Sequence, residues 1–210
     1  EWAIDRSELG RPTAVTTVST DGRDEQVYEL RDTMHIPFEY AHVTETVWRC
    51  ATAPFVGKDR LLGVFRHTED EVFVKHRGES AKHRKGDLML VNVTVMKRYE
   101  VAKGRMMIAW RAMASAPEES APDFHRAYSD EEGYTIIERV PSGIDGLEPG
   151  TAIVRRVARL RPLWKAQDVH IGCQPVLNAD EFTRIVVGST LDDMMALATV
   201  MEDSLLDTSL

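Results

Sequence analysis

The stretch that decides the fold is "NADEFTRIVVGSTLDDMMALATVMEDSLL", residues 178–206. Asn178 is a favourable helix N-cap, and Glu181 follows it three residues later, a spacing typical of a helix start. Apolar residues then recur at helical spacing, which predicts one long helix over residues 179–206. At about 1.5 Å per residue, this helix would be roughly 42 Å long, enough to cross a whole sheet. Its inner stripe is expected to consist of Val187, Leu191, Met194, Ala198, Met201 and Leu205.

Extended segments precede this helix. Residues 27–36, "VYELRDTMHI", alternate as a strand does, and Asp32 interrupts their apolar face. Pro37 ends this strand and opens a helix that is expected to reach residue 51. Further strands are predicted, joined in part by short turns that favour antiparallel neighbours, over residues 60–67, 71–78, 87–101, 105–114, 134–140 and 151–163.

This order of elements predicts an α+β fold in which a curved antiparallel sheet wraps around the long C-terminal helix. Such a sheet cannot bring its whole concave surface into contact with one helix, so we expect an internal cavity that takes a small molecule. Residues 1–26 are polar and rich in turn-forming residues, which favours an N-terminal arm or linker. Residues 27–210 would then form the ligand-binding domain.

Composition narrows the possible functions. The chain has 210 residues, 43% of them hydrophobic, and a formal net charge of −8. Because nucleic-acid phosphates must be neutralised by Lys and Arg, we expect no direct binding of nucleic acid by this region. Only Cys50 and Cys173 occur, without metal-site spacing, which favours a reducing intracellular setting, cytoplasmic or nuclear.

Arg111 is a single charge within the apolar run "MMIAWRAMA", residues 106–114. A guanidinium remains charged, so its burial requires a partner or a ligand. Because Arg111 shares a strand face with Met107, Ala109 and Met113, we expect it to line the cavity and orient a polar end of the ligand. The opposite face is also apolar, so an edge-strand arginine that reaches solvent is the alternative.

Several motifs resemble the START-like, helix-grip proteins, which are also described as Bet v 1-like. The resemblance covers residues 27–206 and rests on "GRMMIAWR" (104–111), on "AIVRRVARLRPL" (152–163) and on the helix that begins "NADEF". More narrowly, "IAWRAMA" (108–114), "EEGYTIIERV" (131–140) and "RLRPL" (159–163) are similar to START-like domains of oomycete mating-specific proteins. Some of those relatives carry an upstream basic zipper, which implies a transcription-linked role.

The resemblance implies a lipid or other hydrophobic ligand held between the sheet and the C-terminal helix. It matches Arg111 to an arginine that projects into the family's cavity and often pairs with an acid on a neighbouring strand. The candidate acids here are Asp32, Glu100 and Glu138. Flexible methionines suit such a wall, although they also fill ordinary cores. The expected ligand-binding residues are Met107, Ala109, Arg111, Met113, Val91, Val93, Met194, Met195, Ala198 and Met201.

Other chemistry has weak support in the sequence. The spacing of His67, His76 and His83 fits no zinc site, and neither a G-x-S-x-G nor an H-E-x-x-H motif occurs. We therefore expect no metal, no cofactor and no catalytic residue that the sequence can identify. Residues 115–133 are predicted to form a long loop, either a lid in which Phe124 and Tyr128 close an opening or a surface excursion.

A basic island interrupts the acidic chain at residues 75–85. It is either a solvated hairpin or a site of peripheral contact with an anionic membrane. The residues concerned are Lys75, Arg77, Lys82, Arg84 and Lys85.

Three functions are compatible with these features. The first is a carrier or sensor module that binds a hydrophobic small molecule. The second is an enzyme of the same architecture that acts on such a molecule. The third is a domain without a pocket that binds protein through its convex face. The first is favoured because the order of elements predicts a cavity, whereas no motif predicts catalysis.

Overall fold

The architecture was taken from a computed structural model of the chain. It describes residues 16–19, 26–53, 61–77, 81–83, 86–88, 90–116, 127–143, 146–164 and 179–207.

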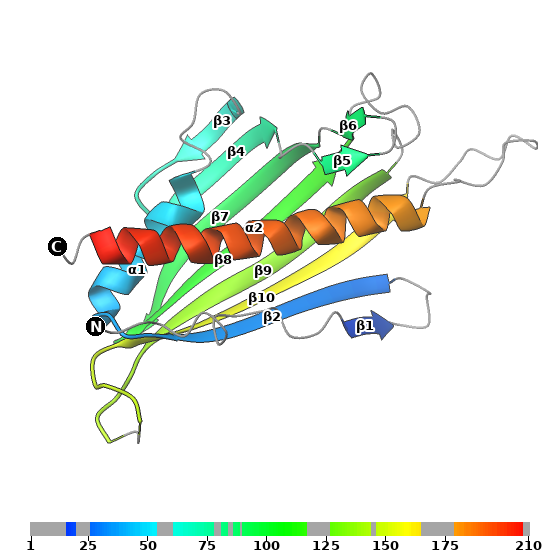
Figure 1. Cartoon of the computed structure of the whole chain (residues 1–210). Coiled ribbons are helices and arrows are strands. Elements are labelled where there is room, and N and C mark those ends of the chain that lie inside the picture. The colour runs from blue at the N-terminus through cyan, green and yellow to red at the C-terminus, as the bar shows by residue number, and fades with distance from the viewer. Residues whose placement is uncertain are drawn as a thin grey trace, which may run out of the picture.

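An antiparallel sheet of eight strands forms the body of the molecule (Figure 1). Its strands run in the order β1-β2-β10-β9-β8-β7-β4-β3. Their bounds are β1 (Thr16–Ser19), β2 (Gln26–Ile36), β3 (Leu61–His67), β4 (Glu71–Arg77), β7 (Val91–Ala102), β8 (Arg105–Ser115), β9 (Ala127–Arg139) and β10 (Ala152–Trp164). A separate small hairpin pairs β5 (Ala81–His83) with β6 (Gly86–Leu88).

Two helices complete the described fold, α1 (Tyr40–Thr52) and α2 (Ala179–Asp207). Figure 1 shows α2 lying across one face of the sheet, with its C-terminal end beside α1. We call the sheet face that α2 covers the inner face and the opposite one the outer face. The predicted α+β fold, with a curved sheet against a long C-terminal helix, is confirmed.

The core lies between the inner face and the two helices. Alternate strand residues such as Leu30, Ile108 and Ile137 are almost fully buried there. The buried positions of α2 are Phe182, Val186, Thr190, Met194, Met201 and Leu205. The predicted stripe is therefore right in the C-terminal half of α2 and displaced by one residue in the other half. Steps of four residues turn the stripe gradually around the helix, which suits contact with a twisted sheet.

Strand β9 begins seven residues earlier than the sequence predicts, at Ala127 instead of residue 134. The prediction of a loop over residues 115–133 is therefore wrong for residues 127–133, and Tyr128 belongs to the strand. The acidic run "SDEE" is stable in a strand because its side chains have partners on neighbouring elements. Residues 117–126, including Phe124, lie outside the described ranges, and the lid stays a prediction. Within the predicted arm, residues 16–19 pair with β2 as β1.

Gly133 marks a close approach between the indole of Trp110 and β9. A Cβ added at this position would lie 2.3 Å from Trp110 Cζ2 and 2.5 Å from the Val157 carbonyl oxygen. Glycine is therefore needed here for space, since any side chain would displace the tryptophan or the neighbouring backbone.

We expect Gly133→Ala to lower the free energy of unfolding by about 1–3 kcal/mol through overpacking. Gly63→Ala is the matched control, because an added Cβ there has nothing within 4 Å. Denaturant unfolding of both variants measures the difference. Equal stability of the two variants would contradict the close approach.

Candidate functional site

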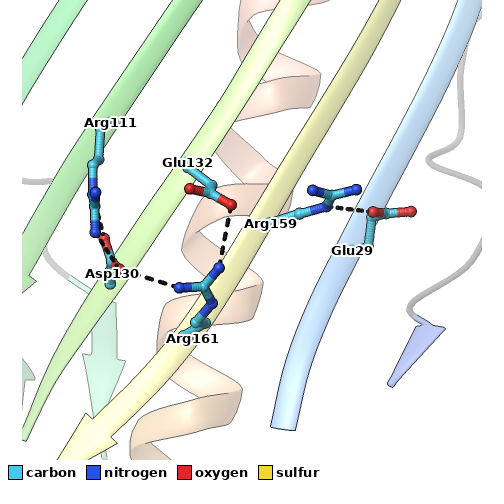
Figure 2. Close-up of polar contacts among 6 residues, drawn as sticks. All are labelled: Glu29, Arg111, Asp130, Glu132, Arg159 and Arg161. Carbon is cyan, nitrogen blue, oxygen red and sulfur yellow. Dashed lines mark hydrogen bonds and ion pairs between the residues drawn. The ribbon is translucent and has the colours of Figure 1, made fainter. Parts of the chain in front are cut away.

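The predicted cavity wall on the strands lies on the outer face. Arg111 points away from α2, and its side chain is 60% exposed. Its Nε and Nη2 atoms donate to the two carboxylate oxygens of Asp130, at 3.0 and 2.9 Å (Figure 2). The prediction that Arg111 projects toward the long helix is therefore wrong, and its partner is none of the three acids considered. The outer face also carries the other predicted strand residues, Met107, Ala109, Met113, Val91 and Val93.

Of the four predicted wall residues on α2, three face the sheet and one does not. Met194 and Met201 are buried against the sheet, and Ala198 packs partly buried against the same core. Met195 is 51% exposed and does not face the sheet, so its placement in the wall is wrong. The structure therefore does not bring the ten predicted residues together at one site.

Charged residues form a lattice across the outer face (Figure 2). Asp130 also lies 3.7 Å from Arg161, which donates to Glu132 at 3.2 Å. Further along the face, Arg159 donates to Glu29 at 2.7 Å. This hydrogen bond, helped by a second from Arg31, holds the pKa of the Glu29 carboxyl below its ordinary value. These groups neutralise one another across strands, which accounts for them without a ligand.

An open groove of about 510 Å³ runs along the outer face beside Arg111. Its lining residues come from β3, β4, β7 and β8 and are Arg66, Glu71, Val95, Lys97, Tyr99, Ala109, Trp110 and Arg111. Apolar residues nearby are unusually exposed, among them Val93, Val95, Tyr99 and Met113. This groove is a candidate site on the sheet face opposite α2.

The buried arginine of the inner face is Arg156 on β10. It lies directly opposite Asp32 on β2, and both residues are almost fully buried. Arg156 Nε and Nη2 donate to Asp32 Oδ2, the former at 3.0 Å. Nη1 of the same guanidinium donates to the Met194 carbonyl oxygen of α2 at 2.9 Å. One side chain therefore connects two strands to the helix, while Asp32 Oδ1 has no hydrogen-bond partner among the described residues.

A second polar group lies under α2, around Glu131 on β9. Trp110 Nε1 donates to Glu131 Oε1 at 3.0 Å, and the Thr190 hydroxyl lies 3.0 Å from Glu131 Oε2. Burial raises the pKa of the Glu131 carboxyl above its ordinary value, although the two hydrogen bonds oppose the shift. Ionisable groups in such apolar surroundings are characteristic of functional sites and also of structural networks.

A signal for the inner face was present in the sequence. On β10, one set of alternate residues carries Arg155, Arg159 and Arg161, whereas the other carries Arg156 alone. On β8, Arg105 and Arg111 share one set, and the other contains no charge. Counting charges in each set would have assigned both faces correctly.

The remaining candidates have local partners or lie outside the described ranges. His35 Nε2 is 2.9 Å from the Thr151 hydroxyl, and His76 Nε2 is 3.2 Å from that of Thr94. In the basic island, Lys75 and Arg77 are exposed, whereas Arg84 and Lys85 lie outside the described residues. The described residues hold no cluster of His, Cys, Asp or Glu that could bind a metal ion. Of the helices among these residues, neither α1 nor α2 has both the length and the apolar character needed to cross a membrane.

We expect Arg156→Met to lower the free energy of unfolding by about 3–5 kcal/mol, because it leaves the buried Asp32 carboxylate without its cation. Adding Asp32→Leu to this variant should restore part of the loss. Arg111→Met, at the exposed pair, is the control and should barely move the denaturant midpoint. Equal losses from the two single arginine variants would contradict the assignment of Arg156 as the buried member.

Comparison with known proteins identifies the fold. No protein-family model matches the chain, and no curated protein matches it in sequence. The solved structure of the Zhui aromatase/cyclase from Streptomyces sp. R1128 is similar, with 11% identity, a TM-score of 0.51, and coverage of 86% of this chain and 96% of that one. The human StarD13 lipid transfer and protein localization domain matches at 9% identity and a TM-score of 0.41, over 89% of this chain and 88% of that one. The chain therefore has a START-like, helix-grip fold.

Proposed function

We propose that this domain binds a lipid or another hydrophobic small molecule between the inner face and α2, as a carrier or sensor module. The observation that carries the proposal is incomplete coverage of β8 by the helix. Ile108 on the inner face is 1% exposed, whereas Ala112 and Ala114 on the same face are only partly buried. Small residues beside an apolar helix leave space of the kind that hydrophobic ligands occupy.

The buried charges favour a particular polar end for the ligand. Arg156 already donates to Asp32 and to the Met194 carbonyl oxygen, whereas Asp32 Oδ1 is a buried acceptor without a partner in the described part of the chain. An unpaired buried acceptor is costly, and a ligand hydroxyl would satisfy it. We therefore expect a neutral molecule with a hydroxyl group in preference to a carboxylate.

An enzyme of the same architecture is the second candidate. It is favoured by the pair Asp32–Arg156 and by Glu131, ionisable groups that face the helix from the inner face. The similar Streptomyces protein is an aromatase/cyclase, so the fold accommodates catalysis. This candidate would be favoured if the protein converts a bound compound, and if Glu131→Gln abolishes the conversion but not the binding.

Two further proposals concern other surfaces. Lys75, Arg77, Lys82, Arg84 and Lys85 would contact anionic headgroups while a carrier loads or unloads its ligand. The apolar part of the outer face, with Val93, Val95, Tyr99 and Met113, would suit a protein partner. The likeness to oomycete mating-specific proteins, with its transcription-linked role, rests on the sequence motifs alone.

We expect Ala112→Phe to fill the proposed space and remove copurifying ligand, which native mass spectrometry of gently purified protein detects as added mass. Ala109→Phe is the matched control, since it places the same ring on the outer face of the same strand, within the open groove. Retention of ligand by Ala112→Phe and its loss from Ala109→Phe would place binding in the groove instead. Circular dichroism should show that both variants remain folded.

We expect dodecanol to displace a fluorescent hydrophobic probe at lower concentration than dodecanoate does, because the vacant buried acceptor selects a donor. The two compounds share one chain length, so the comparison isolates the polar end. Tighter binding of dodecanoate would contradict the expected preference for a neutral hydroxyl compound. It would still support binding of a hydrophobic ligand at this site.

A further inference from the structure

Two side chains contact the Glu131 carboxyl group. The number of protons available for these contacts bears on whether the group is ionised. Its Oε1 accepts the indole proton of Trp110 at 3.0 Å, and its Oε2 lies 3.0 Å from Thr190 Oγ1. The same Thr190 oxygen lies 3.1 Å from the carbonyl oxygen of Val186, one helical turn earlier. The hydroxyl of Thr190 therefore has two acceptors within reach and only one proton to donate.

An additional proton on Glu131 resolves this conflict. If the carboxyl group is ionised, the Thr190 hydroxyl donates its proton either to Glu131 or to the Val186 carbonyl oxygen. At the other contact, two oxygen atoms then face each other with no proton between them. If Glu131 Oε2 carries a proton, it donates to Thr190 Oγ1, and Thr190 donates onward to Val186. Threonine commonly bonds to the carbonyl four residues back in a helix. Trp110, Glu131, Thr190 and Val186 then form a continuous chain in which every contact is a hydrogen bond.

The surroundings of Glu131 favour the neutral form. Its cross-strand neighbours are Ala112 on β8 and Leu160 on β10, both without charge. On β9, Asp130 and Glu132 point to the outer face, where Arg111 and Arg161 bind them. Burial acts in the same direction by raising the pKa of the Glu131 carboxyl.

Charged groups on the other elements of the inner face are distant or engaged. Arg156 on β10 pairs with Thr135, four residues along β9, which is about 13 Å away at roughly 3.3 Å per residue. That guanidinium is already bound to Asp32 on β2 and to α2. His76 lies on β4, beyond β8 and β7, and contacts Thr94, while Asp192 and Asp193 of α2 are exposed.

We propose that Glu131 is held as a neutral carboxylic acid whose proton fastens the middle of α2 to β8 and β9, so that loss of this proton loosens the helix. The proposal does not depend on the presence of a ligand. Glu131 is only partly buried, so its proton exchanges with solvent. The result is a latch that holds below the pKa of the folded-state carboxyl and releases above it.

Proton linkage gives the direction of the effect. An acid whose pKa is raised on folding stabilises the fold fully below its unfolded-state pKa, near 4.3 for glutamate, and loses this contribution as pH rises through the folded-state pKa. Between the two values, the folded state binds one more proton than the unfolded state does. The unfolding constant attributable to Glu131 therefore rises about tenfold per pH unit in this window.

The test compares the wild type with Glu131→Gln between pH 4 and pH 9. Glutamine keeps an acceptor for Trp110 and a donor for Thr190 but cannot ionise. We expect the ratio of the wild-type to the variant unfolding constant to rise about tenfold per pH unit above pH 4 and then to level off. A ratio that is independent of pH would show that Glu131 ionises normally in the folded protein and would overturn the proposal.

Glu132→Gln is the matched control, because it neutralises the adjacent carboxylate on the outer face, where the side chain is 40% exposed. The ratio of the wild-type to the Glu132→Gln unfolding constant should not rise with pH, because both proteins keep Glu131. The same rise with both variants would overturn the proposal, since it would not be specific to the carboxyl on the inner face.

Two direct measurements do not depend on a variant that folds. The carbon-13 shift of the Glu131 carboxyl in the wild type should titrate above the ordinary glutamate pKa, which is near 4.3. Amide exchange over residues 186–194, corrected for its intrinsic pH dependence, should accelerate above the pKa of Glu131. Titration of Glu131 at or below the ordinary glutamate pKa, or protection of these amides that does not change with pH, would overturn the latch.

Discussion

Contact between one helix and the inner face is the constraint on which the rest of this structure depends. Three groups of buried side chains line that contact: Met201 and Leu205 pack with α1, Met194 packs with Leu30 and Ala158, and Phe182 and Val186 pack with Leu160. Each fully buried side chain contributes roughly 1.5–3 kcal/mol. In the described part of the chain, α2 and α1 cover the inner face, so its buried polar groups must be satisfied by these helices, by one another or by a ligand.

The two faces use the same residue types in different ways. On the outer face, arginines and acids lie side by side in water, where each ion pair contributes little to stability. Their main effect is to prevent charges of the same sign from lying next to one another on neighbouring strands. On the inner face, charges are few and each needs a partner, because desolvation is expensive. Arg156 meets this need by binding both Asp32 and the backbone of α2. Glu131 meets it through Trp110 and Thr190, without a cation. These polar groups lie directly under the helix, where the proposed ligand and the proposed proton latch would both act on the helix–sheet contact.

Most of the fold could be predicted from local patterns. The bounds of α2 follow from its apolar periodicity and differ from the prediction by one residue at the C-terminal end. The assignment of sheet faces failed at β8, because Met106, Ile108 and Trp110 on one face and Met107, Ala109 and Met113 on the other are equally apolar. A lone arginine in that apolar run predicts a cavity position, but its partner, Asp130, lies in a segment whose acidity predicts a loop. That segment is a strand because Arg111 and Arg161 neutralise it from both sides, and local patterns do not contain such cross-strand pairing.

Local sequence patterns specify the class of fold, because hydrophobic periodicity, proline positions and turns give the order and length of the elements. The resemblance to START-like proteins likewise came from motifs along the chain. Which arginine is buried, where the acidic run lies and which methionines face the sheet follow from the folded arrangement. Those outcomes depend on strand register and on side chains far apart in the chain, such as Asp32 and Arg156, whose charges become costly only after folding removes the water around them.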